Sequence, residues 1–438
     1  MRAIGLTILI FLASFSGCFG EDTPDEIVPT LSIEEITMAT RGQLLTIGVD
    51  SNVAYSVNRT PGLFFVDADG VFRDATVMTI AAGQPLEILI LDSERESVGL
   101  TFNNGGLDIL LNLTLEDSAE MMLVDGRRAF DTIDMLTTDY NNRWCASADT
   151  PLTGNGANYE AAAEAMKTIW EDYGFDFVEV TRYEDDPDQI NVVGYKYGNV
   201  YPDQYIVIGG HFDVAYAATP PGGGTSEGAN DDTSGSTVSM ELAQALGSRE
   251  WDHTVVAALW ACEEEGLLGS AAFVNHLQEN NTVKAYMNFD MVSLNYPIIP
   301  PPGYGPYDLS IATAGANEEN LTKMNEWVRM TVEDEMEFHD VPSNDIYWES
   351  AESCASDHCS FFTHGFATFN FFSAGGDASF WQEWHSGTDN LDFMVTKAGG
   401  SENLGNGFNT LTWSALCLFV HVDNTNDSFQ GRWASENG

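Results

Sequence analysis

Five segments of this chain carry metal-binding side chains in the order His, Asp, Glu, Asp, His, each where a strand is expected to end. The segments are residues 205–213, 227–236, 255–270, 285–293 and 384–390. Two His and three carboxylates can hold two divalent metals when one carboxylate bridges them, and such a centre activates water for hydrolysis. The third segment contains more than one Glu, so one Glu would remain free to act as a base.

Each of these residues is weaker evidence alone than the set is together. His211 and Asp213 are two positions apart, a spacing that lets the carboxylate accept the second ring N–H and orient the imidazole, as metal-bound His requires. Asp231 alone is typical of a helix N-cap, and the adjacent Asp232 could take its place as a ligand. Asp290 lies inside an apolar strand, where an unpaired carboxylate is unfavourable.

Three consecutive glutamates, Glu263, Glu264 and Glu265, follow an apolar strand. Adjacent carboxylates beside a buried strand are costly unless a positive charge lies near them. A solvated run of charges explains the three glutamates more simply when they are considered in isolation. The order of all five segments instead favours a metal ligand and a base in this run.

The elements that must position these side chains alternate between strand and helix from about residue 124 onward. Short apolar strands precede the candidate ligands, and helical patterns occur at 131–142, 158–173 and 317–333. This alternation predicts an α/β domain with a largely parallel sheet. Ligands at the carboxyl ends of such strands fall where open sheets place their binding sites.

The motifs together resemble those of the M28 family of zinc peptidases, which includes aminopeptidases with two zinc ions. The resemblance covers residues 124–419, and the matching strings are GGHFD, GANDDTSGS, CEEEGLLGS, NFDMVS, SDHCSF and HSGTDN. It implies a central, largely parallel mixed sheet flanked by helices, similar to that of zinc aminopeptidases. It also implies a metallopeptidase that acts on peptides and most commonly releases their N-terminal residues.

The resemblance further implies a ligand set for two zinc ions per chain. Asp231 would bridge the two metals. His211 and Asp290 would complete the coordination of one metal, and Glu264 and His385 that of the other.

Three more residues receive roles from the same resemblance. Glu263 would be the general base, which takes a proton from the attacking water and returns it to the leaving amine. Asp213 would support catalysis by holding the imidazole of His211. Glu265 corresponds to a variable position and has no metal role.

Three other function classes remain as alternatives. A glutaminyl-cyclase-like acyltransferase of the same fold would bind a single zinc, whereas the intact GANDDTSGS string favours two metals. A carboxypeptidase or dipeptidase would be helped by a basic residue near the site, for which Arg249 and Arg329 are candidates. A non-enzymatic lipoprotein would bind partners through its N-terminal domain.

The N-terminal region predicts export and attachment to a membrane. Residues 1–17 read as a signal peptide, and Phe15-Ser16-Gly17-Cys18 resembles a lipobox in which Cys18 is lipidated, although Leu is more usual than Phe15. An ordinary secretory signal with an incidental Cys is the alternative. Residues 18–30 form an acidic tether, 31–123 a small β-rich domain, and 124–438 the peptidase domain.

Cysteine usage and charge narrow the setting further. Besides Cys18 the chain has five cysteines, so at least one thiol stays unpaired, and Cys354 and Cys359 are close enough in sequence to bridge. The formal net charge of -50 argues against nucleic acid and against an anionic membrane surface as partners, since both are polyanions. The lipid on Cys18 is therefore the expected membrane contact, and the simplest explanation of the charge is an acidic surface suited to a salty medium.

Overall fold

The computed structural model describes residues 28–106, 108–117, 122–146, 154–183, 186–216, 226–278, 281–292, 309–313, 346–350, 355–373 and 383–425. The predicted signal peptide, Cys18, the predicted helix at 317–333, Arg329 and Cys354 lie outside these residues. Within them, no helix combines the length and the apolar character that a membrane crossing requires. The chain divides into two compact units, one made of Met1–Asp67 and Phe72–Glu120, the other of Ala68–Val71 and Met121–Gly438.

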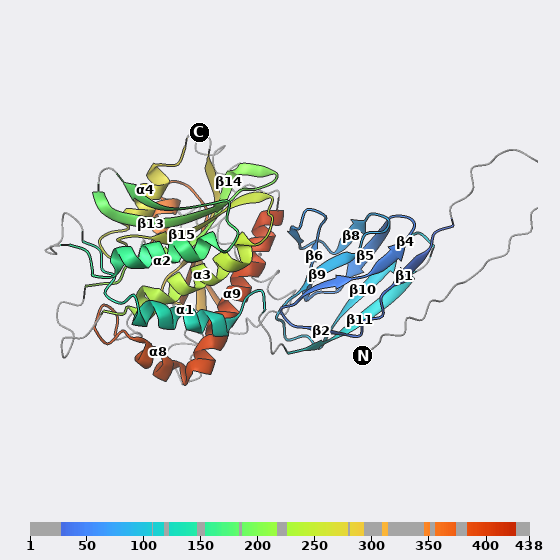
Figure 1. The fold of residues 1–438 in the computed structure, drawn as a ribbon, viewed down its shortest axis with the longest axis horizontal. Coiled ribbons are helices and arrows are strands. Elements are labelled where there is room, and N and C mark those ends of the chain that lie inside the picture. The colour runs from blue at the N-terminus through green and yellow to red at the C-terminus, as the bar shows by residue number, and fades with distance from the viewer. Residues whose placement is uncertain are drawn as a thin grey trace, which may run out of the picture. The chain divides into compact units, whose positions relative to one another are not determined.

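The first unit consists of β-strands, as the sequence predicts (Figure 1). One sheet has the strand order β2-β11-β10-β5-β8, a second β3-β9-β6-β7, and β1 pairs with β4. Side chains of the two larger sheets share one apolar core, which makes this unit a sandwich. The strands are β1 Leu31–Ile33, β2 Met38–Thr40, β3 Leu44–Ile47, β4 Val49–Ser51, β5 Tyr55–Arg59, β6 Leu63–Val66, β7 Phe72–Arg73, β8 Val77–Ile80, β9 Leu86–Ile90, β10 Ser97–Asn103 and β11 Asp108–Glu116.

The second unit is built on an eight-stranded mixed sheet with the order β12-β13-β15-β14-β16-β19-β17-β18. The central strands β15, β14, β16 and β19 run parallel to their neighbours in this group, whereas β12, β13 and the β17–β19 pair are antiparallel. The strands are β12 Phe177–Tyr183, β13 Asp186–Lys196, β14 Tyr201–His211, β15 His253–Trp260, β16 Thr282–Phe289, β17 Leu309–Thr313, β18 Ile346–Ser350 and β19 Thr368–Ser373.

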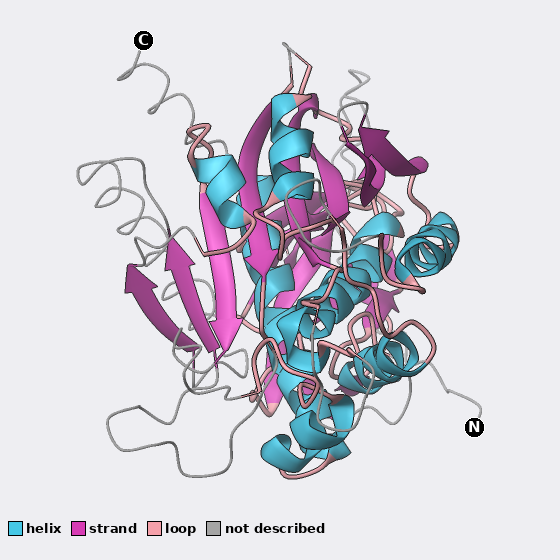
Figure 2. Ribbon diagram, turned by 90° about the vertical axis from the view of Figure 1, so that its left-hand side faces the viewer, coloured by secondary structure: helices cyan, strands magenta, loops and turns pink. Residues whose placement is uncertain are grey.

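Helices cover both faces of this sheet, which gives the α/β fold that the strand–helix alternation predicts (Figure 2). All residues of β15 are buried, as expected for a parallel strand packed between two helical layers. On one side, α2 and α3 contact the sheet and α9 packs on α3, and on the other side α4 and α7 contact it. The helices are α1 Gly126–Thr138, α2 Tyr159–Glu171, η1 Ala229–Thr233, α3 Ser234–Gly247, α4 Leu268–Asn275, α7 His358–Phe362, α8 Leu391–Ala398 and α9 Ser401–Asn424.

The first helix of this unit begins five residues before the position expected from the sequence pattern and ends four residues before it. The side chain of Asp125 accepts a hydrogen bond from the backbone N–H of Arg127 and caps the helix at its N-terminus. The buried face of α1 includes Ala129, which precedes the predicted stretch 131–142, and Ile133, which lies within it. The helix at 158–173 matches α2 closely, with Asn158 as its first flanking residue.

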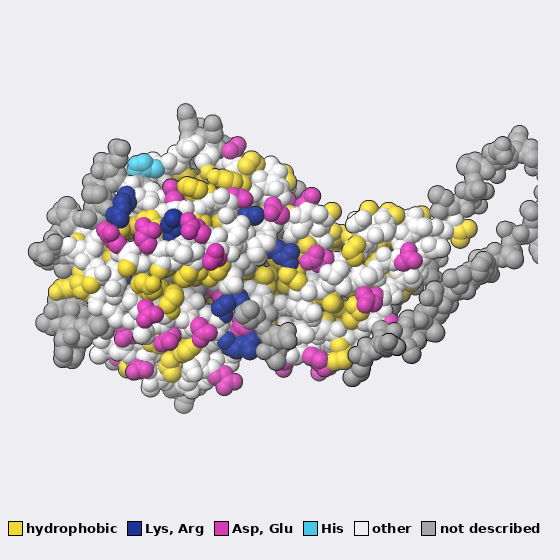
Figure 3. Space-filling view, viewed as in Figure 1, with side chains coloured by type: hydrophobic (Ala, Val, Ile, Leu, Met, Phe, Trp, Pro, Cys, Tyr) yellow, Lys and Arg dark blue, Asp and Glu magenta, His cyan; other side chains and the backbone are white. Residues whose placement is uncertain are grey.

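The surface agrees with the acidic composition. On the face drawn in Figure 3, Asp and Glu side chains are dispersed over each unit and outnumber Lys and Arg. A dispersed distribution of charge solvates a surface without forming one strongly charged patch, which fits the interpretation of the net charge of -50.

Candidate metal centre

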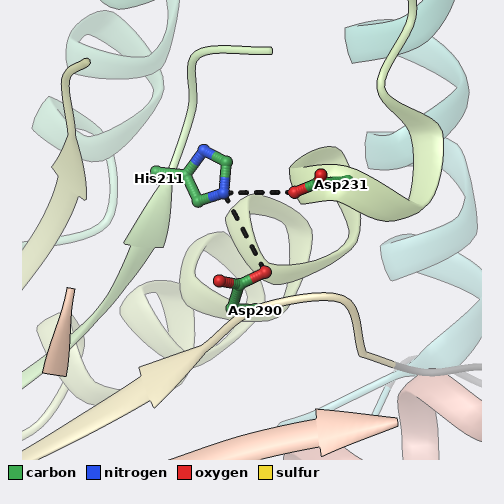
Figure 4. Close-up of side chains that lie close together, drawn as sticks. All are labelled: His211, Asp231 and Asp290. Atoms are coloured by element: carbon green, nitrogen blue, oxygen red, sulfur yellow. Dashed lines mark ion pairs between the residues drawn. The ribbon is translucent and has the colours of Figure 1, made fainter. Parts of the chain in front are cut away.

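Three predicted ligands form one cluster at the carboxyl edge of the central strands. His211 is the last residue of β14, Asp290 follows β16, and Asp231 comes from η1 before α3. The Nε2 of His211 lies 3.4 Å from Oδ1 of Asp231 and 3.9 Å from Oδ1 of Asp290 (Figure 4). One ligand atom of each residue lies within 4.8 Å of the other two, and all three side chains are buried.

A second cluster uses the other oxygen of the same Asp231. The Nε2 of His385 lies 3.2 Å from Oδ2 of Asp231 and 2.8 Å from Oε2 of Glu264. Asp231 is thus the residue common to both clusters. The arrangement of the five predicted ligands is that of two adjacent sites sharing a carboxylate.

The neighbouring Asp232 has a different environment. Its Oδ1 accepts hydrogen bonds from the backbone N–H groups of Gly235 at 2.9 Å and Met291 at 3.0 Å. Asp232 therefore ties the start of α3 to the chain just after Asp290. The structure places Asp231, and not Asp232, between the two histidines.

Two glycines allow the ligand-bearing strands to approach this closely. A Cβ atom on Gly210 would lie 2.5 Å from the backbone oxygen of Phe289 and 2.8 Å from Oδ2 of Asp232. A Cβ atom on Gly235 would lie 2.2 Å from the same oxygen of Phe289. Because no side chain fits in either place, only glycine lets β14 and α3 pack against the end of β16.

Glu263 lies beside the first cluster, with its Oε2 3.9 Å from Nε2 of His211. Its backbone N–H donates to Oδ1 of Asp213 at 3.0 Å. The carboxylate of Asp213 therefore connects the His211 loop with the glutamate run, and through it Glu263 is held at the edge of the site.

The hydrogen bond that orients His211 differs from the one we expect from the sequence. Its Nδ1 lies 3.1 Å from the main-chain oxygen of Asp213 and 3.5 Å from the carboxylate Oδ1 of that residue. Since a carbonyl oxygen can only accept, it favours a hydrogen on Nδ1 and leaves Nε2 available to a metal. The carboxylate is displaced from the closer position because it also receives the N–H of Glu263.

The two histidines and the shared Asp231 support each other electrostatically. Burial alone would lower the pKa of His211, but Glu263, Asp213 and Asp231 raise it well above its usual value. Burial likewise opposes the effect of Asp231 and Glu264 on His385, yet these carboxylates raise its pKa to about 10. Burial favours protonation of Asp231, but hydrogen bonds from both histidines hold its pKa well below the usual range.

Burial and the charges of neighbouring carboxylates raise the pKa values of the remaining acidic side chains. Burial and the charge of Asp231 raise the pKa of Glu264 to about 7, and burial raises that of Asp290 to about 6. Burial raises the pKa of Glu263 well above its usual value, although His211 opposes this effect. Such a concentration of buried acids is unfavourable without added positive charge, which a divalent metal supplies.

The residues present fit zinc. Among the described residues, the buried atoms Nε2 of His211 and Oε1 of Glu264 have no hydrogen-bond partner. Nitrogen and oxygen ligands at zinc distances of about 2.0–2.2 Å in a tetrahedral arrangement lie about 3.3 Å apart. The facing nitrogen and oxygen atoms in the two clusters are 2.8 to 3.9 Å apart. His and carboxylate ligands are those expected for a zinc site that keeps positions open for water.

The backbone around the site adopts left-handed conformations at residues other than glycine. Cys262 precedes Glu263 and has φ 53°, Met291 follows Asp290 and has φ 50°, and the ligand His385 has φ 54°. Such conformations cost non-glycine residues on the order of 1–3 kcal/mol each. The strained residues lie directly beside, or are themselves, the residues that build the two clusters.

Asp389 and Arg143 support the site but are not among the residues that sequence reasoning identified. The carboxylate of Asp389 accepts the backbone N–H groups of Asn230 at 2.9 Å and Asp231 at 3.0 Å. It thereby joins the His385 loop to the Asp231 loop. The HSGTDN string already contains Asp389, and an Asp four residues after a ligand His is the signal that could have indicated it.

Sequence reasoning also considered Arg249 as a residue that could bind a substrate carboxylate. Arg249 follows α3 and precedes β15, and its backbone N–H donates to the oxygen of Leu246. This loop leads into the amino end of β15, whereas the metal ligands gather at the carboxyl ends of the strands. Arg249 therefore does not lie at the candidate site.

A disulfide bond between Cys145 and Cys262 joins residues 117 positions apart. Cys262 directly precedes Glu263, so the bond anchors the glutamate run to the segment before α2. Among the described residues, Cys417 is a buried cysteine that forms no disulfide bond, in accordance with the odd number of cysteines. Cys359 is also disulfide-bonded, but Cys354 lies outside the described residues, so the pairing of Cys359 with Cys354 stays a prediction.

A comparison with protein-family models extends these observations. Residues 191–402 match the model of peptidase family M28. The chain is therefore similar to this family over just under half of its length. The matched segment contains every predicted ligand and Glu263, the predicted base.

Similar proteins share a limited part of this chain. A probable zinc metalloprotease of Leptosphaeria maculans is 35% identical over 103 residues, which are 23% of this chain and 24% of that protein. A probable leucine aminopeptidase 2 of Aspergillus oryzae is 37% identical over 101 residues, 22% of this chain and 19% of that protein. A glutamate carboxypeptidase 2 homolog of Caenorhabditis elegans is 36% identical over 112 residues, 24% and 13% respectively. The chain thus spans about a quarter or less of their length.

Solved structures confirm the fold. The Legionella pneumophila LapA aminopeptidase has a TM-score of 0.51 at 14% identity, covering 86% of this chain and 100% of that one. A glutaminyl cyclase of Bacteroides thetaiotaomicron has a TM-score of 0.50 at 15% identity, covering 69% and 99%. Because the two have different activities, the fold does not distinguish a peptidase from a cyclase.

Proposed function

We propose that this chain is a zinc-dependent exopeptidase that most commonly releases the N-terminal residue of peptides, with two zinc ions per chain. One observation carries the proposal. The two carboxylate oxygens of Asp231 face different histidines, Oδ1 facing His211 of the first cluster and Oδ2 facing His385 of the second. A carboxylate in this position serves as the bridge between two metals. A substrate amino group and the carbonyl of the bond to be cleaved can then be held side by side.

Five side chains of this chain would hold the metals. His211 and Asp290 would hold one ion, Glu264 and His385 would hold the other, and Asp231 would contribute to both sites. When bound, zinc supplies a water molecule of lowered pKa and polarises the peptide carbonyl.

Glu263 moves the proton in this proposal. Its carboxylate takes the proton of the attacking water and delivers it to the nitrogen of the leaving amine, so the proton is conserved through the cycle. The hydrogen bond from its backbone N–H to Asp213 fixes the start of the glutamate run. His211 keeps its Nδ1 hydrogen on the carbonyl of Asp213, which leaves its Nε2 directed to the metal.

The cyclase alternative is less well supported by this site. A single-zinc enzyme does not need a shared carboxylate together with a second complete ligand set, and here both sets are assembled. Of the two basic residues considered for a carboxypeptidase, Arg249 lies away from the site and Arg329 lies outside the described residues. The similarity to both an aminopeptidase and a carboxypeptidase homolog makes the direct assay of products necessary.

Measuring metal content and substrate choice in one set of experiments tests the proposal. We expect about two zinc per chain by elemental analysis, release of N-terminal residues from unblocked peptides, and complete loss of that release with a chelator. N-blocked peptides should not be cleaved, and peptides beginning with Gln should lose the Gln and not cyclise. One zinc per chain with cyclisation would establish the cyclase function instead, and no zinc after reconstitution would exclude both enzymes.

We further propose that the protein is exported and anchored at the cell surface through a lipid on Cys18. The Cys145–Cys262 disulfide supports export, because such bonds persist mainly in oxidising compartments. Cys18→Ser should move the protein from the membrane fraction into the medium, with unchanged peptidase activity. If the membrane fraction of that variant equals that of the wild type, Cys18 is not the anchor.

A further inference from the structure

The segment immediately after α1 contacts three of the loops that carry metal ligands. The backbone N–H of Asn142 donates to the oxygen of Ser226 at 2.7 Å, and the N–H of Ser226 donates back to Oδ1 of Asn142. The ring of Trp144 packs edge-on against that of Tyr216 at 5.0 Å. Together with the Cys145–Cys262 disulfide, these contacts connect the segment to the chain after His211, before Asp231 and before Glu263.

Arg143 is the centre of this segment and is fully buried. Its Nε donates to the backbone oxygen of Phe212 at 2.8 Å, which lies between His211 and Asp213. One of its terminal nitrogens donates to Oγ1 of Thr233 at 2.5 Å, two residues after Asp231. The planar guanidinium thus spans the two loops that supply His211 and Asp231, two of the three ligands of the first cluster.

The other terminal nitrogen fastens Arg143 to the helix before it. It donates to the backbone oxygens of Leu136 at 2.9 Å and Tyr140 at 2.8 Å. Burial lowers the pKa of Arg143 to about 10, against the effect of Asp213, Asp232 and Glu227, so the group keeps its charge at neutral pH. A rigid fork of donors is therefore fixed to α1 at one end and to both ligand loops at the other.

We propose that Arg143 is a positioning residue for the metal centre, which sets the spacing between the His211 loop and the Asp231 loop through its hydrogen bonds to Phe212 and Thr233. This inference rests on the proposed zinc site. A positioning role and a simple charge effect predict opposite changes in zinc affinity when Arg143 is replaced. A buried positive charge repels a divalent cation, so loss of charge alone would strengthen zinc binding, whereas loss of the spacing weakens it.

The test measures zinc affinity by competition with a chromogenic chelator, without reference to activity. Arg143→Met and Arg143→Lys should each weaken zinc binding at the first site by about 10–100-fold, the range typical of residues that orient metal ligands. Lys keeps the charge but cannot donate along both directions of the fork at once. Thr233→Val, which removes the hydroxyl that accepts from Arg143 and donates to the main-chain oxygen of Glu227, should weaken binding in the same direction and by less.

Arg182→Met is the matched control, because it removes one positive charge from a partly exposed side chain of the same unit. It should leave zinc affinity unchanged. The melting temperature of each zinc-free variant separates positioning from general stability. If Arg143→Met does not fold, the effect on zinc affinity can still be measured with Thr233→Val and Arg143→Lys.

Three results would overturn the inference while leaving the proposed function intact. Tighter zinc binding in Arg143→Met with no change in Arg143→Lys would show that Arg143 acts through its charge. A lower melting temperature with unchanged zinc affinity in all three variants would show a purely structural role. Weaker binding in Arg182→Met to the same degree would show that any loss of charge has this effect. Absence of zinc from the wild type would instead refute the proposed function itself.

Discussion

Glu263→Gln is expected to lower kcat/KM for peptide hydrolysis by about 10²–10⁴-fold while the protein keeps its zinc. This is the range for loss of a general base. The amide has nearly the shape of the carboxylate but cannot accept the proton of the attacking water. The side chain of Glu263 lies 3.9 Å from the ligand nitrogen of His211 and belongs to neither ligand cluster of the described residues. Steady-state kinetics and elemental analysis of the same preparation check the result.

The other two glutamates of the run provide controls of the same chemistry. Glu264→Gln should weaken zinc at the second site, because Oε2 of Glu264 lies 2.8 Å from the ligand nitrogen of His385. Glu265→Gln should change neither zinc content nor rate. If Glu263→Gln instead loses zinc and Glu264→Gln keeps it, the roles assigned to these two positions are reversed.

The zinc-free protein is expected to become less stable as the pH rises from about 4.5 to 8. Burial raises the pKa of Glu264 to about 7 and that of Asp290 to about 6. The folded protein holds these protons at pH values where the unfolded chain releases them, so their stabilising contribution is lost as the pH rises through the folded values. The raised pKa of His385 acts in the same direction above about 6.5. The lowered pKa of Asp231 contributes a constant amount across this range.

Zinc should reverse this dependence, because it replaces the protons on the same carboxylates and binds more tightly as they leave. Thermal melts of chelator-treated and zinc-loaded protein between pH 5 and 8 measure both effects. We expect the melting temperature without zinc to fall by several degrees and the increment due to zinc to grow with pH. A zinc increment that is constant over this range would mean that these carboxylates do not exchange protons for metal.

Residue types and their order were sufficient to predict the α/β fold and the residues that meet at the site. Apolar strands followed by His, Glu or Asp place those side chains at one edge of a parallel sheet whatever the details of packing. His211 and Asp290 could be found in this way because each ends, or directly follows, a strand that is largely buried. The helix at 158–173 was predictable from its periodicity alone.

The supporting contacts could not be predicted because they depend on tertiary distances. Arg143 lies in a segment without periodicity, and its partners are up to 90 positions away. The family resemblance selected Asp231 over Asp232, but the contact that separates their roles, from the N–H of Met291 to Asp232, joins residues almost 60 positions apart. The closer hydrogen bond of His211 goes to a backbone oxygen, which every residue has and no sequence pattern identifies.

The left-handed backbone at Cys262, Met291 and His385 has a consequence for protein engineering. A designer who transplants only the five ligand side chains onto another α/β sheet would place them on relaxed turns, which aim the same side chains in different directions. The transplant must therefore include the turn geometry, and glycine or asparagine is the natural choice at the two non-ligand positions. The two clusters use only five side chains, but the turns that hold these side chains must be copied with them.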